Sequence, residues 1–114
     1  MSKRPVNLLI EDIWDAVSKI DRYVDGMTKD SFTSDNKTVD AVARNFEIIG
    51  EAAARLPEDF RVQHRNVEWT KIIGLRHRII HGYFGVDLEL LWLIMQKDLP
   101  LFRSAVQLIR DSLP

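Results

Sequence analysis

The chain contains no cysteine. This absence excludes disulfides, zinc sites built on thiolates and catalysis by a cysteine nucleophile, and it fits a protein of the reducing cytoplasm. Long apolar runs are also lacking, because the stretch Leu8–Ile10 ends at Glu11 and is too short for a signal peptide or a membrane span. We therefore expect a soluble cytoplasmic protein that does not enter the membrane.

Neither sign of charge dominates the chain. Sixteen Lys and Arg residues stand against seventeen Asp and Glu residues, for a net charge of −1. No overall charge attracts nucleic acid, so any such binding must use a local patch. The charge is nevertheless uneven, because six basic and only three acidic residues lie between Arg55 and Gly82, together with all three histidines. With 46% hydrophobic residues, the 114 residues are expected to fold as one domain, residues 1–114, around one core.

Apolar residues recur at three- and four-residue steps along most of the chain, which predicts helices throughout. Ser34 or Asp35 is expected to cap the second helix, and Asp87 the fourth. Residues 57–68 are polar, with one short helical turn at best. Short connections favour antiparallel neighbours, so we expect an all-α, antiparallel up-down bundle of four to five helices. The predicted helices are Leu9–Val24 with a stop at Gly26, Val39–Ala53 ending before Pro57, Trp69 to Ile80 or Gly82, Leu88–Lys97, and Leu99–Leu113 with Pro100 in its first turn.

Two of these helices indicate how the bundle packs. The segment Leu88–Met95 is apolar around most of its circumference and must be covered on more than one side, which predicts a homodimer. Gly50 and the alanines at 52–54 are small residues inside the second helix. They predict a close approach by a neighbouring helix.

The stretch Gly74–Asp87 carries the candidate site. It sets Arg76, His77, His81 and Tyr83 into an otherwise apolar helical pattern. Arginine grips and neutralises phosphate, and histidine moves protons near neutral pH. The cluster therefore indicates chemistry on a phosphate group.

Helical geometry sets a condition on this cluster. On one helix Arg76 and Tyr83 share a face, and so do His77 and His81, but Arg76 and His81 lie about 140° apart. Arg76 and His81 can meet one phosphate only if the helix ends or distorts near His81, or if a second protomer contributes. Gly82 is a plausible end. A two-fold dimer would bring two copies of His81 together, one to act as base and one as acid.

Other interpretations of the same residues stay open. Arg76 and Arg78 can be solvated charges, with His81 capping a helix C-terminus. His77 and His81 have the spacing of a two-histidine zinc site, but Arg78 stands between them and would repel a dication. We therefore expect no metal site. Glu51 is a candidate to orient Arg76 from the second helix.

Aromatic residues and missing motifs narrow the choice further. Trp69 and Trp92 are interpreted as core anchors, with the alternative that one of them lines a groove. The sequence has no glycine-rich phosphate loop and no order of serine, histidine and aspartate typical of hydrolases.

The chain resembles the HEPN domains, and within them the HepT-like toxin ribonucleases. The motif is Arg76-x4-His81-x-Tyr83, and further segments match in order and spacing over nearly the whole chain. These are Ile49-Gly-Glu-Ala52, Trp69-x2-Ile72-x-Gly74-x-Arg76, Asp87-x4-Trp92 and Asp98-Leu-Pro100. The residue after the motif arginine is commonly Asn in this family and is His77 here, which can also donate a hydrogen bond.

This resemblance implies a helical bundle that dimerises with its motif helices meeting at a cleft. It implies a metal-independent endoribonuclease without a cofactor, in which Arg76 and His81 are catalytic and His77 and Tyr83 support them. It also implies a cognate antitoxin, a minimal nucleotidyltransferase that binds the toxin and adds AMP groups to Tyr83. The alternative is a non-catalytic helical module that binds a nucleotide or a partner protein, and the near-neutral charge is the feature that favours it.

Overall fold

A computed structural model describes residues 3–81 and 85–114. Over these ranges the chain is helical apart from its connections and one isolated antiparallel bridge between Ile80 and Val86. The all-α prediction is thus confirmed. The elements in chain order are α1 (Val6–Val24), α2 (Lys29–Thr33), α3 (Asn36–Arg55), α4 (Glu58–Gln63), α5 (Trp69–Ile73), α6 (Leu75–Ile79), α7 (Leu88–Leu93), the π-helical segment η2 (Ile94–Asp98) and α8 (Leu99–Ser112).

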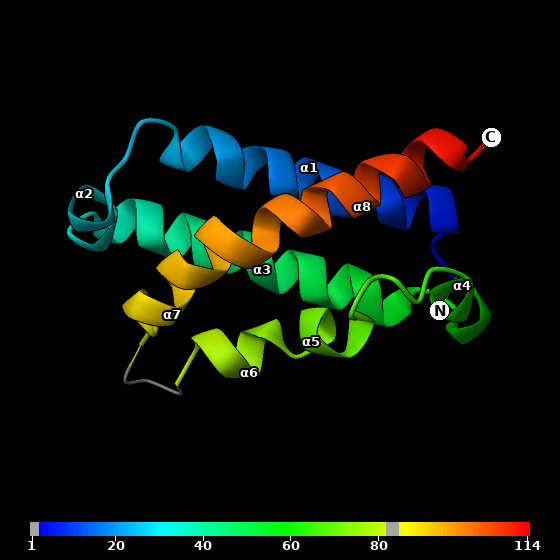
Figure 1. The fold of residues 1–114 in the computed structure, drawn as a ribbon. Coiled ribbons are helices and arrows are strands. Elements are labelled where there is room, and N and C mark those ends of the chain that lie inside the picture. Colours follow the sequence, from blue (N-terminus) through cyan, green and yellow to red (C-terminus); the bar gives the residue numbers. More distant parts are fainter. Residues whose placement is uncertain (1–2, 82–84) are drawn as a thin grey trace.

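The long elements lie side by side in an up-down order, as predicted. Figure 1 shows α1 and α8 along one side, α3 in the middle, and α5 with α6 along the opposite side. Each of these runs opposite to the one before it in the chain. Among the helices in the described ranges, none has both the length and the apolar character needed to cross a membrane.

Helix α3 is the centre of the bundle, because α1, α2, α5 and α6 all pack against it. It begins where predicted: the Asp35 side chain accepts a hydrogen bond from the Thr38 amide at 3.1 Å. The expected close approach occurs at Gly50. A Cβ atom placed there would lie 3.1 Å from the Ile72 carbonyl oxygen and 3.3 Å from that of Ile73. Gly50 therefore lets the backbone of α5 rest directly on α3.

Helix α1 also follows its apolar periodicity. Its buried residues include Leu9, Ile13 and Ile20, spaced to face α3 and α8. The predicted stop at Gly26 is confirmed, since Gly26 has a φ of +75°, a conformation that other residues rarely adopt.

Helix α2 was not expected from the sequence. It is only five residues long and is held by a capping box, in which Thr28 and Ser31 exchange hydrogen bonds. Its buried Phe32 packs on Trp92 of α7, with ring centroids 5.6 Å apart. Part of the apolar circumference of α7 is thus covered within the chain, while Leu93 remains 48% exposed.

The third predicted helix, Trp69 to Ile80 or Gly82, is wrong in one respect. It is broken at Gly74, whose φ of −83° and ψ of 2° end α5 and start α6. Glycine stabilises a helix least among residues other than proline, and the break lets both short helices follow the surface of α3.

The last two predicted helices form one continuous stretch. Asp87 caps its start, accepting a hydrogen bond from the Leu90 amide at 3.1 Å, as expected. The helix then passes through η2 into α8 without leaving helical geometry. Pro100 has no amide hydrogen to donate, and the Leu99 amide bonds five residues back to Ile94. The chain therefore accommodates Pro100 by widening one helical turn, and the helix does not break there.

Candidate active site

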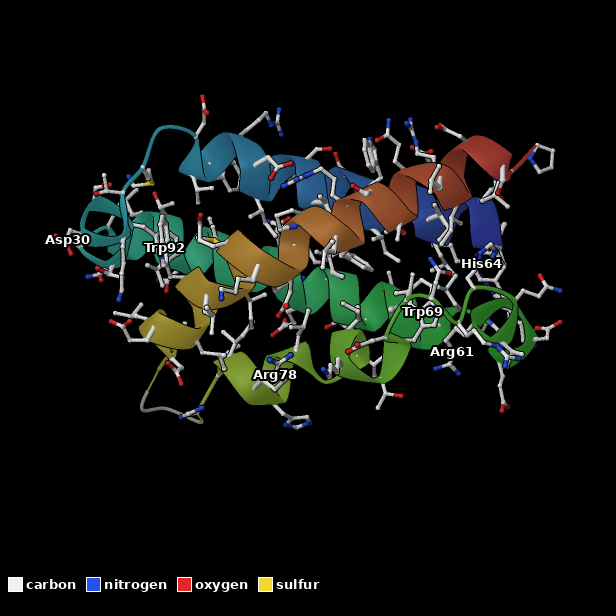
Figure 2. All side chains as sticks on the ribbon, in the orientation of Figure 1. Asp30, Arg61, His64, Trp69, Arg78 and Trp92 are labelled. Atoms are coloured by element: carbon white, nitrogen blue, oxygen red, sulfur yellow. The ribbon has the colours of Figure 1, made fainter. Side chains whose placement is uncertain are left out.

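Helix α6 presents the motif by burying its apolar side. Leu75 and Ile79, four residues apart, are buried, which leaves Arg76 and His77 exposed. Arg78 is half-buried. Figure 2 shows it rising from α6 toward η2 and α8, away from α4.

The chain leaves helical geometry at Ile80, directly before His81. Ile80 has an extended backbone with a φ of −105° and a ψ of 122°. The His81 amide donates to the Gly85 carbonyl at 2.9 Å, and the Asp87 amide donates to the Ile79 carbonyl at 2.8 Å. The expected end of the helix near His81 is thus confirmed. Arg76 and His81 could meet one phosphate only if the helix ended or distorted near His81, and the backbone does end its helix there.

The two histidines of the motif lie on either side of the end of α6. His81 is exposed, and His77 is exposed on α6. In the described part of the chain, neither imidazole makes a side-chain hydrogen bond. Because α6 ends at Ile79, His77 and His81 do not have the helical spacing that the zinc alternative requires. Tyr83 lies outside the described residues.

Arg76 is held by α3. Its Nε donates to Oε2 of Glu47 at 2.8 Å, and Arg44 Nη1 donates to Oε1 of the same carboxylate at 2.5 Å. The Arg76 side chain is 58% exposed and the Glu47 side chain only 19%. The hydrogen bond from Arg76, aided by Arg44, lowers the pKa of Glu47 below its ordinary range, and partial burial opposes this effect. Glu47 therefore stays ionised between two guanidinium groups.

The prediction that Glu51 orients Arg76 is wrong, since Glu47 has this position. Glu51 lines a separate hollow between α3 and α1, beside Asp15 and Lys19. The reason is the register of the two helices. Residues 72–73 rest on Gly50, and the chain of α5 and α6 runs antiparallel to α3, so Arg76 lies three to four residues back from Gly50. This register places Arg76 beside Glu47.

Sequence reasoning missed both Glu47 and Arg44. Glu47 and Glu51 lie one helical turn apart at the edge of the same helix face, and the sequence does not choose between them. Gly50 carries the signal that could have distinguished Glu47 from Glu51. If an antiparallel neighbour is assumed to contact α3 at Gly50, Arg76 falls beside Glu47.

The basic window between Arg55 and Gly82 does not form one patch around the motif. Arg61 and His64 lie by α4 at one end of the molecule, apart from Arg78 (Figure 2). Trp69 is a core anchor: it is buried, packs edge-on against Phe102 and donates from Nε1 to the His64 carbonyl at 3.0 Å. The charged groups of the candidate site are therefore confined to α6 and to its contact with α3.

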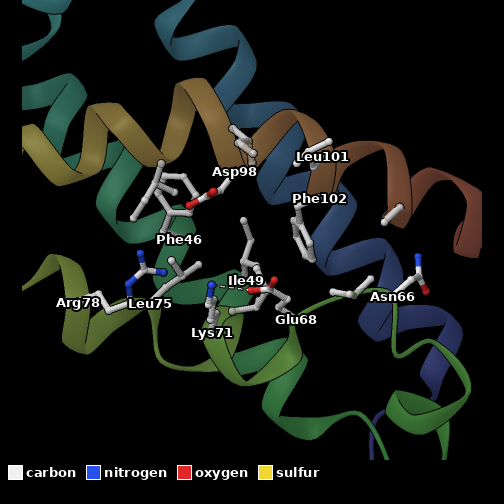
Figure 3. A pocket seen from close by; sticks show the side chains of 15 residues that line it. Phe46, Ile49, Asn66, Glu68, Lys71, Leu75, Arg78, Asp98, Leu101 and Phe102 are labelled. Atoms are coloured by element: carbon white, nitrogen blue, oxygen red, sulfur yellow. Dashed lines mark ion pairs between the residues drawn. The ribbon is translucent and has the colours of Figure 1, made fainter.

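A cavity of about 240 Å³ lies between α3, α5, α6, η2 and α8. Figure 3 shows Phe46, Ile49, Leu75 and Phe102 lining it. Charged groups stand at its rim, among them Lys71, which forms an ion pair with Glu68 at 2.8 Å. The hollow is thus apolar in its depth, unlike the exposed motif surface.

Comparisons with known proteins identify the family of this chain. A family described as ribonuclease HepT-like matches residues 13–109. A protein from Thermococcus cleftensis named probable ribonuclease HepT is 35% identical over 108 residues, covering 95% of this chain and 98% of its own length. A Methanocaldococcus jannaschii protein whose name describes it as a candidate RNase is 36% identical over 109 residues, covering 96% of this chain and all of its own length. No solved structure matches the chain.

Proposed function

This chain belongs to the HepT-like ribonuclease family, and from that premise we propose that it is an endoribonuclease whose reacting groups are Arg76 and His81. One observation carries the assignment of the site. Helix α6 ends at Ile79, two residues before His81, and leaves Arg76 exposed on its last turn, so a guanidinium and an imidazole are both exposed close to this helix end.

The reaction needs no group beyond the chain and the RNA. The ribose 2′-oxygen attacks the adjacent phosphorus, the bond from phosphorus to the 5′-oxygen breaks, and a 2′,3′-cyclic phosphate is left. His81 takes the proton of the 2′-hydroxyl or gives one to the leaving 5′-oxygen. Arg76 stabilises the charge that builds on the phosphorane, where one preorganised donor contributes about 3–4 kcal/mol.

A homodimer would complete this chemistry. One histidine cannot be both base and acid in the same step, and two-fold symmetry would supply a second copy of His81. His77 on the exposed side of α6 is a hydrogen-bond donor to the substrate in this arrangement. RNA would then lie in the cleft between the two motif helices.

In the cell, the protein is proposed to be the toxin of a toxin–antitoxin pair. Its antitoxin is a minimal nucleotidyltransferase that binds it and transfers AMP to Tyr83. In that transfer the phenol oxygen attacks the α-phosphorus of ATP, a phosphodiester forms, and pyrophosphate leaves with the proton going to solvent. A bulky anion on Tyr83, a residue of the same motif as Arg76, would exclude RNA by sterics and repulsion.

The test is cleavage of a single-stranded RNA carrying a fluorophore and a quencher, with EDTA present. Wild type is expected to cleave it, and Arg76→Ala and His81→Ala are each expected to lose about 10²- to 10⁴-fold in rate at unchanged folding. If both variants cleave as fast as wild type, the site is wrong. If wild type binds this RNA without cleaving it, the chain is a binding module.

A further inference from the structure

Among the described residues, a hydrogen bond to Glu47 fixes the direction of the Arg76 side chain. Its long side chain is largely exposed, and a free arginine of this kind samples many rotamers. The bond to Glu47 at 2.8 Å crosses from α6 to α3, between residues 29 apart in sequence. It therefore ties the guanidinium to the central helix of the bundle.

The contact uses only one side of the guanidinium. Glu47 accepts from Nε, while among the described residues no hydrogen bond involves Nη1 or Nη2 of Arg76. These two terminal nitrogens point along the end of the group in a fixed fork that matches two phosphate oxygens. The bond thus leaves the phosphate-binding end open.

Glu47 is itself well held. It follows Phe46 on the twenty-residue helix α3, and Phe46 and Ile49 are buried in the core. Its second oxygen accepts a hydrogen bond from Arg44, so both oxygens of the carboxylate are held by guanidinium groups. One carboxylate between two guanidinium groups also leaves the cluster with a net charge of +1, and attraction for phosphate is kept.

We propose that Glu47 is a positioning residue for RNA cleavage, which fixes the Arg76 guanidinium through Nε so that its terminal nitrogens meet the scissile phosphate. This inference rests on the proposed function. A misplaced catalytic group is costly, because a shift of about 1 Å can lower a rate by about 100-fold.

The test compares Glu47→Ala and Glu47→Gln with wild type in the RNA cleavage assay. Glu47→Ala is expected to lower kcat by about 10- to 100-fold with a smaller change in KM, since a ground-state contact is not lost. Glu47→Gln keeps an acceptor oxygen for Nε and is expected to retain more activity than Glu47→Ala. The matched control is Glu11→Gln, which alters a similar contact, 2.6 Å from Arg110 Nε to Glu11, between α8 and α1. It is expected to cleave like wild type.

A double-mutant comparison separates positioning from other roles. In an Arg76→Ala background, adding Glu47→Ala is expected to cost little more, because the group that Glu47 positions is gone. Equal losses in both backgrounds, or a kcat of Glu47→Ala within about twofold of wild type, would overturn the proposal.

A readout without activity keeps the inference apart from the proposed function. In the ¹H–¹⁵N spectrum of arginine side chains, the Nε–H signal of Arg76, assigned by its loss in Arg76→Lys, is expected to be protected from exchange in wild type and Glu11→Gln. It is expected to lose protection in Glu47→Ala. If wild type fails to cleave RNA, the proposed function fails while this signal still reports whether Glu47 holds Arg76. An unprotected signal in wild type would refute the positioning role.

Discussion

Arginine–carboxylate pairs cross both the contact between α1 and α8 and the contact between α3 and α6, and the pairs of Arg103 and Arg76 differ in how the guanidinium is bound. At the first, Arg103 donates from Nε and Nη2 to both oxygens of Asp21, at 2.8 and 2.5 Å. At the second, Arg76 donates from Nε, its one side-chain hydrogen bond among residues 3–81 and 85–114, and Arg44 donates to the other oxygen of Glu47. Arg103 is also less exposed, at 33% against 58% for Arg76.

This difference separates a structural arginine from one that is ready to bind. A two-bond pair uses up both oxygens of the carboxylate and the side of the guanidinium that matches them. Arg103 thus closes the contact between α1 and α8, with little left to offer a ligand. Arg76 is oriented through Nε, and its terminal nitrogens make no hydrogen bond within the described part of the chain, as recognition of a phosphate requires.

Replacing each arginine by lysine should separate the two roles most strongly. A lysine keeps the charge but has no fork of donors and no Nε bond to a carboxylate. Arg76→Lys is expected to lower the rate of RNA cleavage by about 100-fold and to leave the melting temperature nearly unchanged. Arg103→Lys is expected to cleave RNA like wild type and to lose about 0.5–1 kcal/mol of stability, because the pair is partly exposed. Cleavage kinetics and thermal unfolding of both variants measure this.

The opposite pattern would contradict the comparison. If Arg103→Lys lost as much cleavage as Arg76→Lys at equal stability, the difference in bonding would not distinguish the roles of these two arginines. If Arg76→Lys chiefly unfolded the protein, its pair with Glu47 would be structural.

The frame of the fold was predictable because its signals are local and repeat. The apolar steps of α1 and α3 run over five or more turns, and Asp35 and Asp87 announce helix starts by their capping chemistry. Helix α2 gave no such signal, since five residues are too few for a period to show. Its stability depends on Phe32 meeting Trp92, 60 residues later in the chain.

The candidate site was predictable only in part. The motif residues and the need for a helix end near His81 follow from spacing on an ideal helix. The partner of Arg76 does not, because choosing Glu47 over Glu51 needs the register between α6 and α3. That register is set by the contact of Gly50 with the carbonyls of Ile72 and Ile73, a property of two helices together.

Changing Gly50 to alanine should test this register, with Gly26→Ala as the matched control. A Cβ at Gly50 meets backbone oxygen at 3.1 Å, so α5 must move and carry α6 with it. We expect Gly50→Ala to lose about 1–3 kcal/mol of stability despite the better helix propensity of alanine, and to lose cleavage activity as well. A Cβ at Gly26 would meet no non-neighbouring atom of the described residues within 4 Å, but φ is +75°, so alanine there should cost about 1 kcal/mol and leave cleavage unchanged.

The two glycine variants are compared by urea unfolding and by cleavage under conditions where each is fully folded. Loss of activity in Gly50→Ala alone would place the coupling at the contact of α5 with α3. Full activity in folded Gly50→Ala would show that the site tolerates a shift of α6, and that the register does not set the position of Arg76.

The smallest expected effect is the pH dependence of the contact between α3 and α6. The hydrogen bond from Arg76 holds the pKa of Glu47 below its ordinary value of 4.5, so the folded state binds this proton less tightly than the unfolded state. The stability from the pair is therefore fully present above the unfolded pKa and is lost as pH falls through the folded pKa. Near pH 7 wild type should exceed Glu47→Gln by about 0.2–1 kcal/mol, as expected for a partly exposed pair, and the difference should vanish in acid. Urea unfolding of both proteins across this range measures it, and a difference that persists unchanged at the acid end would mean that packing by residue 47, and not its charge, stabilises the contact.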